Sequence, residues 1–405
     1  MSINEYAPII GKGPVEELKI LAEKLSGKII KIINSTQMGG GVAEILNRMV
    51  PLLNELGVLT KWEVISGNAD FFVITKKIHN ALHGTPVTIT DDEIDLFLQN
   101  NKINAETMDL SGDIVFIHDP QPLALVEKKK EIGNKWTWRC HIDTHAPDWK
   151  LWGFLRKYVE MYDAAVFSSP SFAQTLSINK FLITPSIDPL SLKNQELSKK
   201  TIDSVLKKFD IKKNKPIITQ ISRFDRLKDP IGVIEAYNLV KHSVDCQLIL
   251  AGGTAIDDPE SIEVLSEVRE RVVGDPDIHV LELETPADIE VNALQRASTI
   301  ILQKSIREGF GLTVSEAMWK GKPVIASAVG GITLQITHDY NGLLTRTVEG
   351  TAYAIKELLC NKGYAKRLGK NAKEFAKQNL LITRHIRDYL LLFLSLYHPE
   401  EIVHL

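Results

Sequence analysis

The stretch REGFGLTVSEAM, residues 307–318, joins a strand pattern at 299–302 to a helical pattern at 313–320. Gly309 and Gly311 carry no Cβ atom, so the backbone can approach a ligand closely. The free N–H groups of Gly311, Leu312 and Thr313 would point outward at the start of the helix. A helix N-terminus of this kind is a binding site for anions such as a diphosphate.

Two glutamates flank this junction, Glu308 before the glycines and Glu316 on the helix. Glu308 is placed to accept hydrogen bonds from sugar hydroxyls, and Glu316 to accept both hydroxyls of a ribose. The alternative interpretation is a helix cap between two surface glutamates. We predict that the residues that bind a nucleotide-sugar donor include Glu308, Gly309, Phe310, Gly311, Leu312, Thr313 and Glu316.

A second loop, residues 222–230 (SRFDRLKDP), follows a strand pattern directly. It therefore lies at the carboxyl edge of a parallel sheet, where open α/β sheets bind ligands. Arg223 and Lys228 are predicted to hold one diphosphate and to stabilise the negative charge of a departing nucleoside diphosphate. The alternative is a solvated basic loop that also contains Arg226.

In the first half of the chain, Gly39, Gly40 and Gly41 stand between the first strand pattern and the first helix pattern. They match neither the G-x-G-x-x-G spacing of dinucleotide sites nor a P-loop. Three glycines that enter a helix suit close approach of a donor phosphate or an acceptor sugar. We predict that Gly40 and Gly41 bind the donor, with a tight turn as the alternative.

Polar and aromatic side chains gather after one strand pattern of this half, in residues 118–122, and at another, in residues 136–145. Indoles pack against the C–H faces of sugars, and hydroxyls need acids, histidines or arginines. We predict that His141 is catalytic and contacts the donor sugar. The predicted acceptor-binding residues are His118, Asp119, Trp138 and Asp143. The alternative places the tryptophans in the core and gives the histidines structural partners.

The order of elements predicts two α/β domains, because strand patterns alternate with helical ones throughout. Turn chemistry around 181–200 separates them. We expect an acceptor domain over 1–200, joined by a C-terminal helix at about 383–405, and a nucleotide-sugar domain over 201–382. Both are predicted to be Rossmann-like parallel-sheet domains that face a cleft.

The bulk composition excludes several classes of protein. The chain has 405 residues, a net charge of −3 and three cysteines. Without a basic field, a nucleic-acid partner or an anionic membrane is not expected. The odd cysteine count favours a reducing compartment. No segment is long and apolar enough to span a bilayer, so we expect a cytoplasmic protein.

Taken together, these motifs resemble the retaining GT-B glycosyltransferases of family GT4. The family's paired glutamates match Glu308 and Glu316, and its Arg/Lys pair matches Arg223 and Lys228. Residues 117–122 and 138–143 resemble the glycosyltransferring trehalose synthases (TreT type), relatives of the trehalose phosphorylases. The resemblance implies transfer of glucose from ADP- or UDP-glucose to glucose, giving α,α-trehalose reversibly with retention. The family has a glycine pair where this chain has three glycines.

The expected partners are therefore an NDP-glucose and glucose or trehalose, with a homodimer as one assembly. We predict no essential cofactor or metal, because the cations and the helix N-terminus supply the countercharge; Mg²⁺ is not required. Three other functions remain open: a trehalose phosphorylase, a GT4 transferase with a different acceptor, and a sugar-nucleotide 2-epimerase. A non-catalytic sugar-nucleotide sensor is a fourth.

Overall fold

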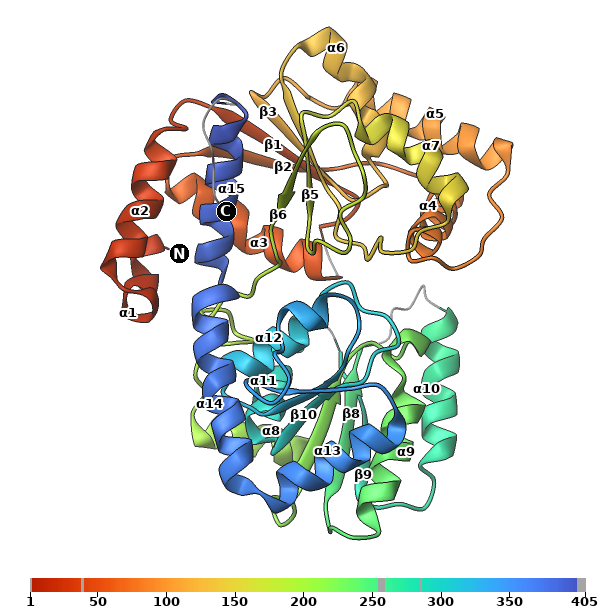
Figure 1. Cartoon of the computed structure of the whole chain (residues 1–405), viewed down its shortest axis with the longest axis vertical. Coiled ribbons are helices and arrows are strands. Elements are labelled where there is room, and N and C mark those ends of the chain that lie inside the picture. The colour runs from red at the N-terminus through yellow and green to blue at the C-terminus, as the bar shows by residue number, and fades with distance from the viewer. Residues whose placement is uncertain (1, 38–39, 254–258, 285, 399–405) are drawn as a thin grey trace. The chain divides into compact units, whose positions relative to one another are not determined.

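The chain folds into two compact units, shown in the computed structural model of Figure 1, which describes residues 2–37, 40–253, 259–284 and 286–398. Unit 1 comprises Met1–Ser186 and the chain from Ile382, and unit 2 comprises Ile187–Leu381. A division after residue 200 would cut through helix α8 (Lys199–Lys208) of unit 2. The change of unit thus comes at the turn around Pro185, before the polar stretch that follows it.

Unit 1 is built on six parallel strands in the order β2-β1-β3-β4-β5-β6. Ile32 of β1 lies opposite both Trp62 of β2 and Phe116 of β3. Every residue of β3 is buried, as expected for a strand covered on both faces. The strands are β1 (Ile29–Asn34), β2 (Leu59–Val64), β3 (Ile114–His118), β4 (Lys135–Arg139), β5 (Ala164–Phe167) and β6 (Asn179–Leu182).

Helices cover both faces of this sheet. Figure 1 shows α15 beside α2 and α3, while α4, α5 and α7 group on the other face. On the first face, Phe116 of β3 packs against Tyr389 and Phe393 of α15, with ring centroids 5.0 and 5.6 Å apart. The α-helices of unit 1 are α1 (Ala7–Ile10), α2 (Lys12–Glu23), α3 (Gly40–Glu55), α4 (Ala69–Leu82), α5 (Asp91–Thr107), α6 (Lys129–Ile132), α7 (Trp149–Val159) and α15 (Ile382–Ser395).

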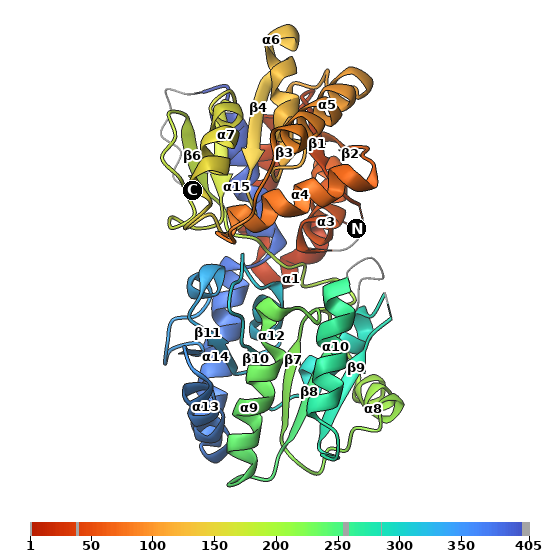
Figure 2. The ribbon, with the colours of Figure 1, turned by 90° about the vertical axis from the view of Figure 1, so that its right-hand side faces the viewer.

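Unit 2 repeats this plan with six parallel strands in the order β12-β11-β10-β7-β8-β9. Figure 2 shows α9 and α10 on one side of this sheet. The strands are β7 (Ile217–Ile221), β8 (Gln247–Gly252), β9 (Ile278–Glu282), β10 (Ile300–Gln303), β11 (Val324–Ser327) and β12 (Leu343–Thr345). The helices are α8, α9 (Pro230–Lys241), α10 (Pro259–Arg271), α11 (Asp288–Ala297), α12 (Leu312–Trp319), α13 (Val348–Cys360) and α14 (Lys362–Asn379).

The sequence pattern predicts one helix over 350–378, but the structure divides this segment into α13 and α14. Asn361 has a non-helical backbone, with φ −111° and ψ 81°, and its side chain accepts the Tyr364 N–H. An asparagine in this conformation caps a new helix instead of continuing the old one. The helical prediction was correct for both segments and missed only this break.

Strand order places the candidate sites. In unit 1 the chain reverses direction across the sheet between β1 and β3, and in unit 2 it does so between β7 and β10. Ligands of open α/β sheets bind beyond the carboxyl ends of the strands at such a reversal. The two glycine-containing loops, the 222–230 loop and the His118 segment all follow these four strands.

Among the described residues, no helix has both the length and the apolar character needed to cross a membrane.

Candidate functional site

The glycine loop of unit 2 ends in a helix whose N-terminus is not capped by the side chain of any described residue. Gly311 is the N-cap of α12 and adopts the left-handed conformation, with φ 83° and ψ 69°. The N–H groups of Gly311, Leu312 and Thr313 make no hydrogen bond to any described residue. Unpaired amides at the positive end of a helix favour an anion, as predicted from the sequence.

A buried glutamine holds this loop in shape. Gln335 accepts the Ser315 hydroxyl at 2.6 Å and donates its amide to the carbonyls of Phe310 and Gly311, at 2.5 and 3.3 Å. Both Gln335 and Ser315 are fully buried. Two backbone oxygens of the loop, those of Phe310 and Gly311, are thus held by a buried side chain.

Gly331 supports the loop from the segment after β11. Its N–H donates to the Glu308 carbonyl at 3.1 Å. A Cβ atom at this position would lie 2.3 Å from the Gly309 oxygen and 2.7 Å from the Phe310 Cα. Two backbones meet here at a distance that only glycine allows. Sequence reasoning missed Gly331, although a Gly-Gly pair two residues after a buried strand signals such an approach.

Glu308 and Lys228 meet at 2.7 Å, although they belong to different loops. Their side chains are 11% and 18% exposed. The same carboxylate oxygen also receives Gln303 Nε2 and the Ser305 hydroxyl, each at 3.3 Å. With three donors around it, the Glu308 carboxylate is held in one orientation at the edge of the sheet.

The two loops are tied together by Gln220, which is buried at the end of β7. Its amide nitrogen donates to the Lys228 carbonyl and its oxygen accepts the Lys304 N–H, both at 2.8 Å. A further backbone bond joins Ile306 N–H to the Leu227 carbonyl at 2.8 Å. Pairing of β7 with β10 therefore brings the predicted cation and the predicted carboxylate together.

The two arginines of the 222–230 loop differ in their partners. Arg223 is 57% exposed and contacts Asp225 of its own loop at 3.3 Å. Arg226 is bound by Glu263 and Glu267 of α10, at 2.8 and 3.0 Å. Since two carboxylates already neutralise Arg226, Arg223 is the arginine whose charge remains available to a ligand.

Two other predicted donor residues lie deeper than the sequence suggests. Glu316 is 3% exposed, accepts the Gln295 amide at 3.1 Å and has Lys193 at 3.9 Å. The Phe310 ring is 6% exposed and packs in the apolar cluster with Val314 and Ile332. Phe310 can therefore offer a ligand only its backbone.

In unit 1, α3 begins at Gly40, which has φ 79°. A Cβ atom at Gly40 would meet nothing within 4 Å, so its positive φ, and not crowding, is what requires glycine. Gly41 lies in the first turn of the same helix. Gly39 lies outside the described residues.

Asp119 joins the ends of β3 and β4. Its N–H donates to the Arg139 carbonyl at 2.7 Å, and its own carbonyl accepts the Trp138 indole N–H at 3.0 Å. Its carboxylate accepts the His141 N–H at 2.8 Å. Burial raises the pKa of the Asp119 carboxyl to about 6, although the His141 N–H and Arg139 act against this. Asp119 adopts φ 65°, which these bonds hold in place.

The two histidines of this region contact each other. Nδ1 of His118 lies 2.9 Å from Nε2 of His141, and the rings are nearly parallel, at 16°. His118 is 2% exposed, whereas His141 is half-buried. Of the pair, His141 is thus the ring placed to meet a ligand, and His118 lies behind it.

Trp138 belongs to the core, which corrects its prediction as a sugar-binding side chain. It is fully buried, packs against Trp152 and Phe167, and uses its indole N–H on Asp119. The alternating pattern of β4 could not show that both of its tryptophans face inward, because the strand is covered on both sides. Asp143 is half-buried and accepts the His145 N–H at 3.0 Å.

Arg139 is a further residue that sequence reasoning passed over. It is fully buried at the end of β4 and donates to the Ser168 hydroxyl at 2.9 Å. In the described part of the chain, its Nε and Nη1 atoms are buried without a hydrogen-bond partner, as are both ring nitrogens of His385 on α15. An arginine at the last position of a buried strand is the signal that could have found it.

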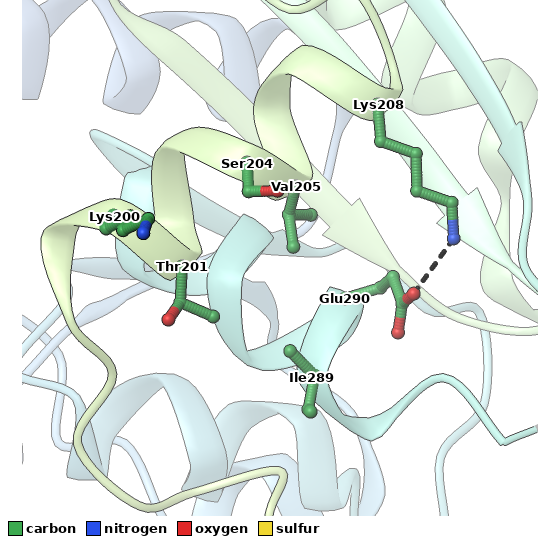
Figure 3. Close-up of a pocket in the computed structure, with 7 residues that line it drawn as sticks. All are labelled: Lys200, Thr201, Ser204, Val205, Lys208, Ile289 and Glu290. Atoms are coloured by element: carbon green, nitrogen blue, oxygen red, sulfur yellow. Dashed lines mark hydrogen bonds and ion pairs between the residues drawn. The ribbon is translucent and has the colours of Figure 1, made fainter.

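Unit 2 also has a surface hollow between α8 and α11, shown in Figure 3. Lys208 binds Glu290 across it at 2.9 Å, and the other lining residues are Lys200, Thr201, Ser204, Val205 and Ile289. None of these residues belongs to either loop cluster described above.

Known proteins resemble the chain along nearly its whole length. Residues 32–174 match the family "Trehalose synthase, N-terminal domain", and residues 201–375 match "Glycosyl transferases group 1". A trehalose synthase of Thermococcus litoralis is 46% identical over 96% of this chain and 95% of its own. A trehalose phosphorylase of Pleurotus pulmonarius is 30% identical over 87% of this chain and 55% of its own.

Solved structures confirm the predicted GT-B fold. An α,α-trehalose-phosphate synthase (UDP-forming) of Burkholderia xenovorans superposes with a TM-score of 0.74. The match covers 91% of this chain and all of the other, at 12% sequence identity. At that identity the likeness concerns the fold alone.

Proposed function

The chain belongs to the trehalose synthases among the group 1 glycosyl transferases, and from this premise we propose which substrates it joins. The donor is an NDP-glucose, either ADP- or UDP-glucose, and the acceptor is glucose. The products are α,α-trehalose and the nucleoside diphosphate. The observation that carries the donor assignment is the Lys228–Glu308 pair beside the unpaired amides of α12.

The diphosphate is assigned to Arg223, Lys228 and the amides of Gly311, Leu312 and Thr313. As the bond from the anomeric carbon to the phosphate oxygen breaks, negative charge develops on the leaving group. Fixed cations and amides stabilise that charge without having to reorganise. Arg223 supplies a planar fork and Lys228 a point charge.

Glu308 is assigned to the hydroxyls of the transferred glucose, and Glu316 to the ribose. The anomeric hydroxyl of the acceptor forms the new C–O bond on the leaving-group face, and its proton goes to a donor phosphate oxygen. The configuration is thereby retained, and in the reverse direction a phosphate oxygen of the NDP attacks the anomeric carbon of trehalose and glucose leaves. His141 is assigned to contact a hydroxyl of the donor glucose, and Asp143 is assigned to bind the acceptor.

The function is tested by incubating the protein with ADP-, UDP- or GDP-glucose and ¹³C-labelled glucose, followed by NMR of the products. We expect labelled α,α-trehalose, formed in step with NDP release. Release of NDP without glucose dependence, or a product with another linkage, would contradict the proposal. A 2-epimerase would instead change the donor sugar in the absence of any acceptor.

A phosphorylase is the second candidate, because the chain also resembles a trehalose phosphorylase. In that reaction inorganic phosphate would occupy the site of Arg223 and Lys228. Incubation with trehalose and phosphate, without nucleotide, separates the two candidates. We expect no glucose 1-phosphate in this mixture and efficient breakdown of trehalose when NDP is added.

Removing the Arg223 guanidinium tests the diphosphate assignment. We expect Arg223→Ala to lose about 2–4 kcal/mol of transition-state stabilisation, by analogy with the loss of one oxyanion donor. This corresponds to a fall in kcat/KM of roughly 30- to 1,000-fold. The melting temperature should hardly change, since the arginine is exposed and has one weak ion pair.

Arg226→Ala is the matched control from the same loop. It loses two exposed ion pairs, to Glu263 and Glu267, but no charge available to the ligand. Its kcat/KM should stay near that of the unmodified protein. Equal losses in the two variants would show that the loop acts only through its overall charge or its conformation.

A further inference from the structure

We propose that His118 is a positioning residue that holds His141 as the Nδ1–H tautomer, so that His141 presents a hydrogen-bond donor to its ligand. The inference about the tautomer stands on the geometry of unit 1. Its consequence for the sugar rests on the function proposed above. The sequence predicted that His118 contacts the acceptor. We assign it instead to positioning His141.

The contact between the rings allows only one proton. Nδ1 of His118 and Nε2 of His141 are 2.9 Å apart, a hydrogen-bond distance that needs one donor and one acceptor. Burial, with Arg139 nearby, lowers the pKa of His118 to about 3. Burial also lowers the pKa of His141, and Arg139, His118 and His385 add to this effect. Both rings are therefore neutral at pH 7, and two arrangements of the shared proton remain.

The far side of His118 decides between these arrangements. Its Nε2 atom is buried and has no hydrogen-bond partner among the residues that the structure describes. If His141 donated, His118 would carry its own proton on Nε2, as an orphaned N–H inside the protein. If His118 donates from Nδ1, Nε2 keeps only a lone pair. An orphaned buried donor is the rarer and costlier of the two.

The charges around the pair favour the same arrangement. Arg139 of β4 acts on both His118 and His141, and its unpartnered Nε and Nη1 atoms are donors only. A lone pair on His118 is attracted to this cation, whereas an N–H would be repelled by it. The other groups that act on the pair are Asp119, through the His141 backbone, and His385 of α15. His385 is neutral, because burial lowers its pKa well below the usual value.

The consequence appears at the exposed edge of His141. Since Nε2 of His141 accepts from His118, the ring's proton must be on Nδ1. Within the described part of the chain, that Nδ1 makes no hydrogen bond. It is also not one of the side-chain atoms that are fully buried without a partner. The bond from the His141 N–H to Asp119 fixes the backbone that carries the ring. His141 thus offers a fixed N–H, which suits a sugar oxygen as its acceptor.

The experiment is NMR of the full chain labelled with ¹⁵N-histidine, in which the long-range correlations of each ring report its protonated nitrogen. In the unmodified protein we expect His141 to show a protonated Nδ1 and an unprotonated Nε2. The opposite pattern would overturn the proposal outright. This measurement needs neither substrate nor activity, so it stands even if the proposed reaction is not found.

Two substitutions test the role of His118. His118→Asn keeps an N–H donor near the position of Nδ1 and should preserve the His141 tautomer. His118→Phe keeps a ring of similar shape without a donor, so the Nδ1–H tautomer of His141 should no longer be enforced. His385→Phe is the control, since it removes a neighbouring buried histidine with no hydrogen bond to the pair. An unchanged His141 tautomer in His118→Phe would contradict the inference.

Kinetics give a second readout. We expect His118→Phe to lower kcat at least tenfold, while His118→Asn stays within about threefold of the unmodified protein. Equal losses in both variants, with the His141 tautomer unchanged, would mean that His118 serves packing alone.

Discussion

Replacing Glu308 by Ala is expected to reduce glucosyl transfer by at least ~10²–10³-fold, the loss found when one preorganised polar group is removed from a reacting centre. The carboxylate receives Lys228, Gln303 and Ser305 in the structure, so it is oriented before any sugar binds. Alanine removes this oriented acceptor and leaves the Lys228 charge without its carboxylate. The measurement is the initial rate of trehalose formation at saturating NDP-glucose and glucose.

The fold should survive this change, because Glu308 lies in a loop at the sheet edge and not in an apolar cluster. The half-buried Lys228 left unpaired should cost about 1–3 kcal/mol in the free energy of unfolding. Glu349→Ala, which removes an exposed glutamate from the first turn of α13, is the control and should leave the rate unchanged. Turnover near that of the unmodified protein in Glu308→Ala would remove this residue from the site.

Gly331→Ala should also have a large effect, on both stability and rate, although a methyl group is all that it adds. The new Cβ atom would lie 2.3 Å from the Gly309 oxygen and 2.7 Å from the Phe310 Cα. Because both neighbours are backbone atoms, the loop itself must move. Overpacking of this kind costs about 1–3 kcal/mol of stability. A displacement of about 1 Å in a substrate-positioning loop can lower the rate ~10²-fold.

Gly363→Ala provides the matched control within unit 2. Its Cβ atom would have only the Asn361 side chain nearby, at 3.7 Å. Alanine near the start of a helix should raise stability slightly, by about 0.4–1 kcal/mol, without affecting the rate. Both variants are compared by melting temperature and by kcat/KM. If Gly331→Ala lowered the melting temperature but left kcat/KM unchanged, the glycine loop would not position the donor.

Some features of the site could be predicted because they are local properties of the chain. The glycines at 309 and 311, the helix that follows them and the cationic loop after β7 are each readable within a dozen residues. The order of the strands in each sheet could not be predicted from the sequence. The prediction that loops after parallel strands lie at one edge of the sheet holds for any order. Lys228 and Glu308 are therefore found together, as the positions of their loops require.

Other features depend on which residues from distant segments meet, and no local pattern contains that information. Gln335 and Gly331 support the glycine loop only because the segment after β11 folds back onto it. The sequence predicts that Trp138 and His118 bind the acceptor, but helices cover both faces of their sheet and bury these two side chains.

The amino-acid sequence by itself determined the two parallel α/β units, the carboxyl edges that carry chemistry, and the residue types suited to a phosphorylated sugar. It could do so because helical and strand periods, and the need for glycine in a turn, are set by neighbouring residues. Only the tertiary structure decided which of these side chains are oriented, which are buried and which of the two histidines meets solvent. Burial and hydrogen-bond partners arise from packing between segments far apart in the chain, as between β3 and α15, where Phe116 packs against Tyr389 and Phe393.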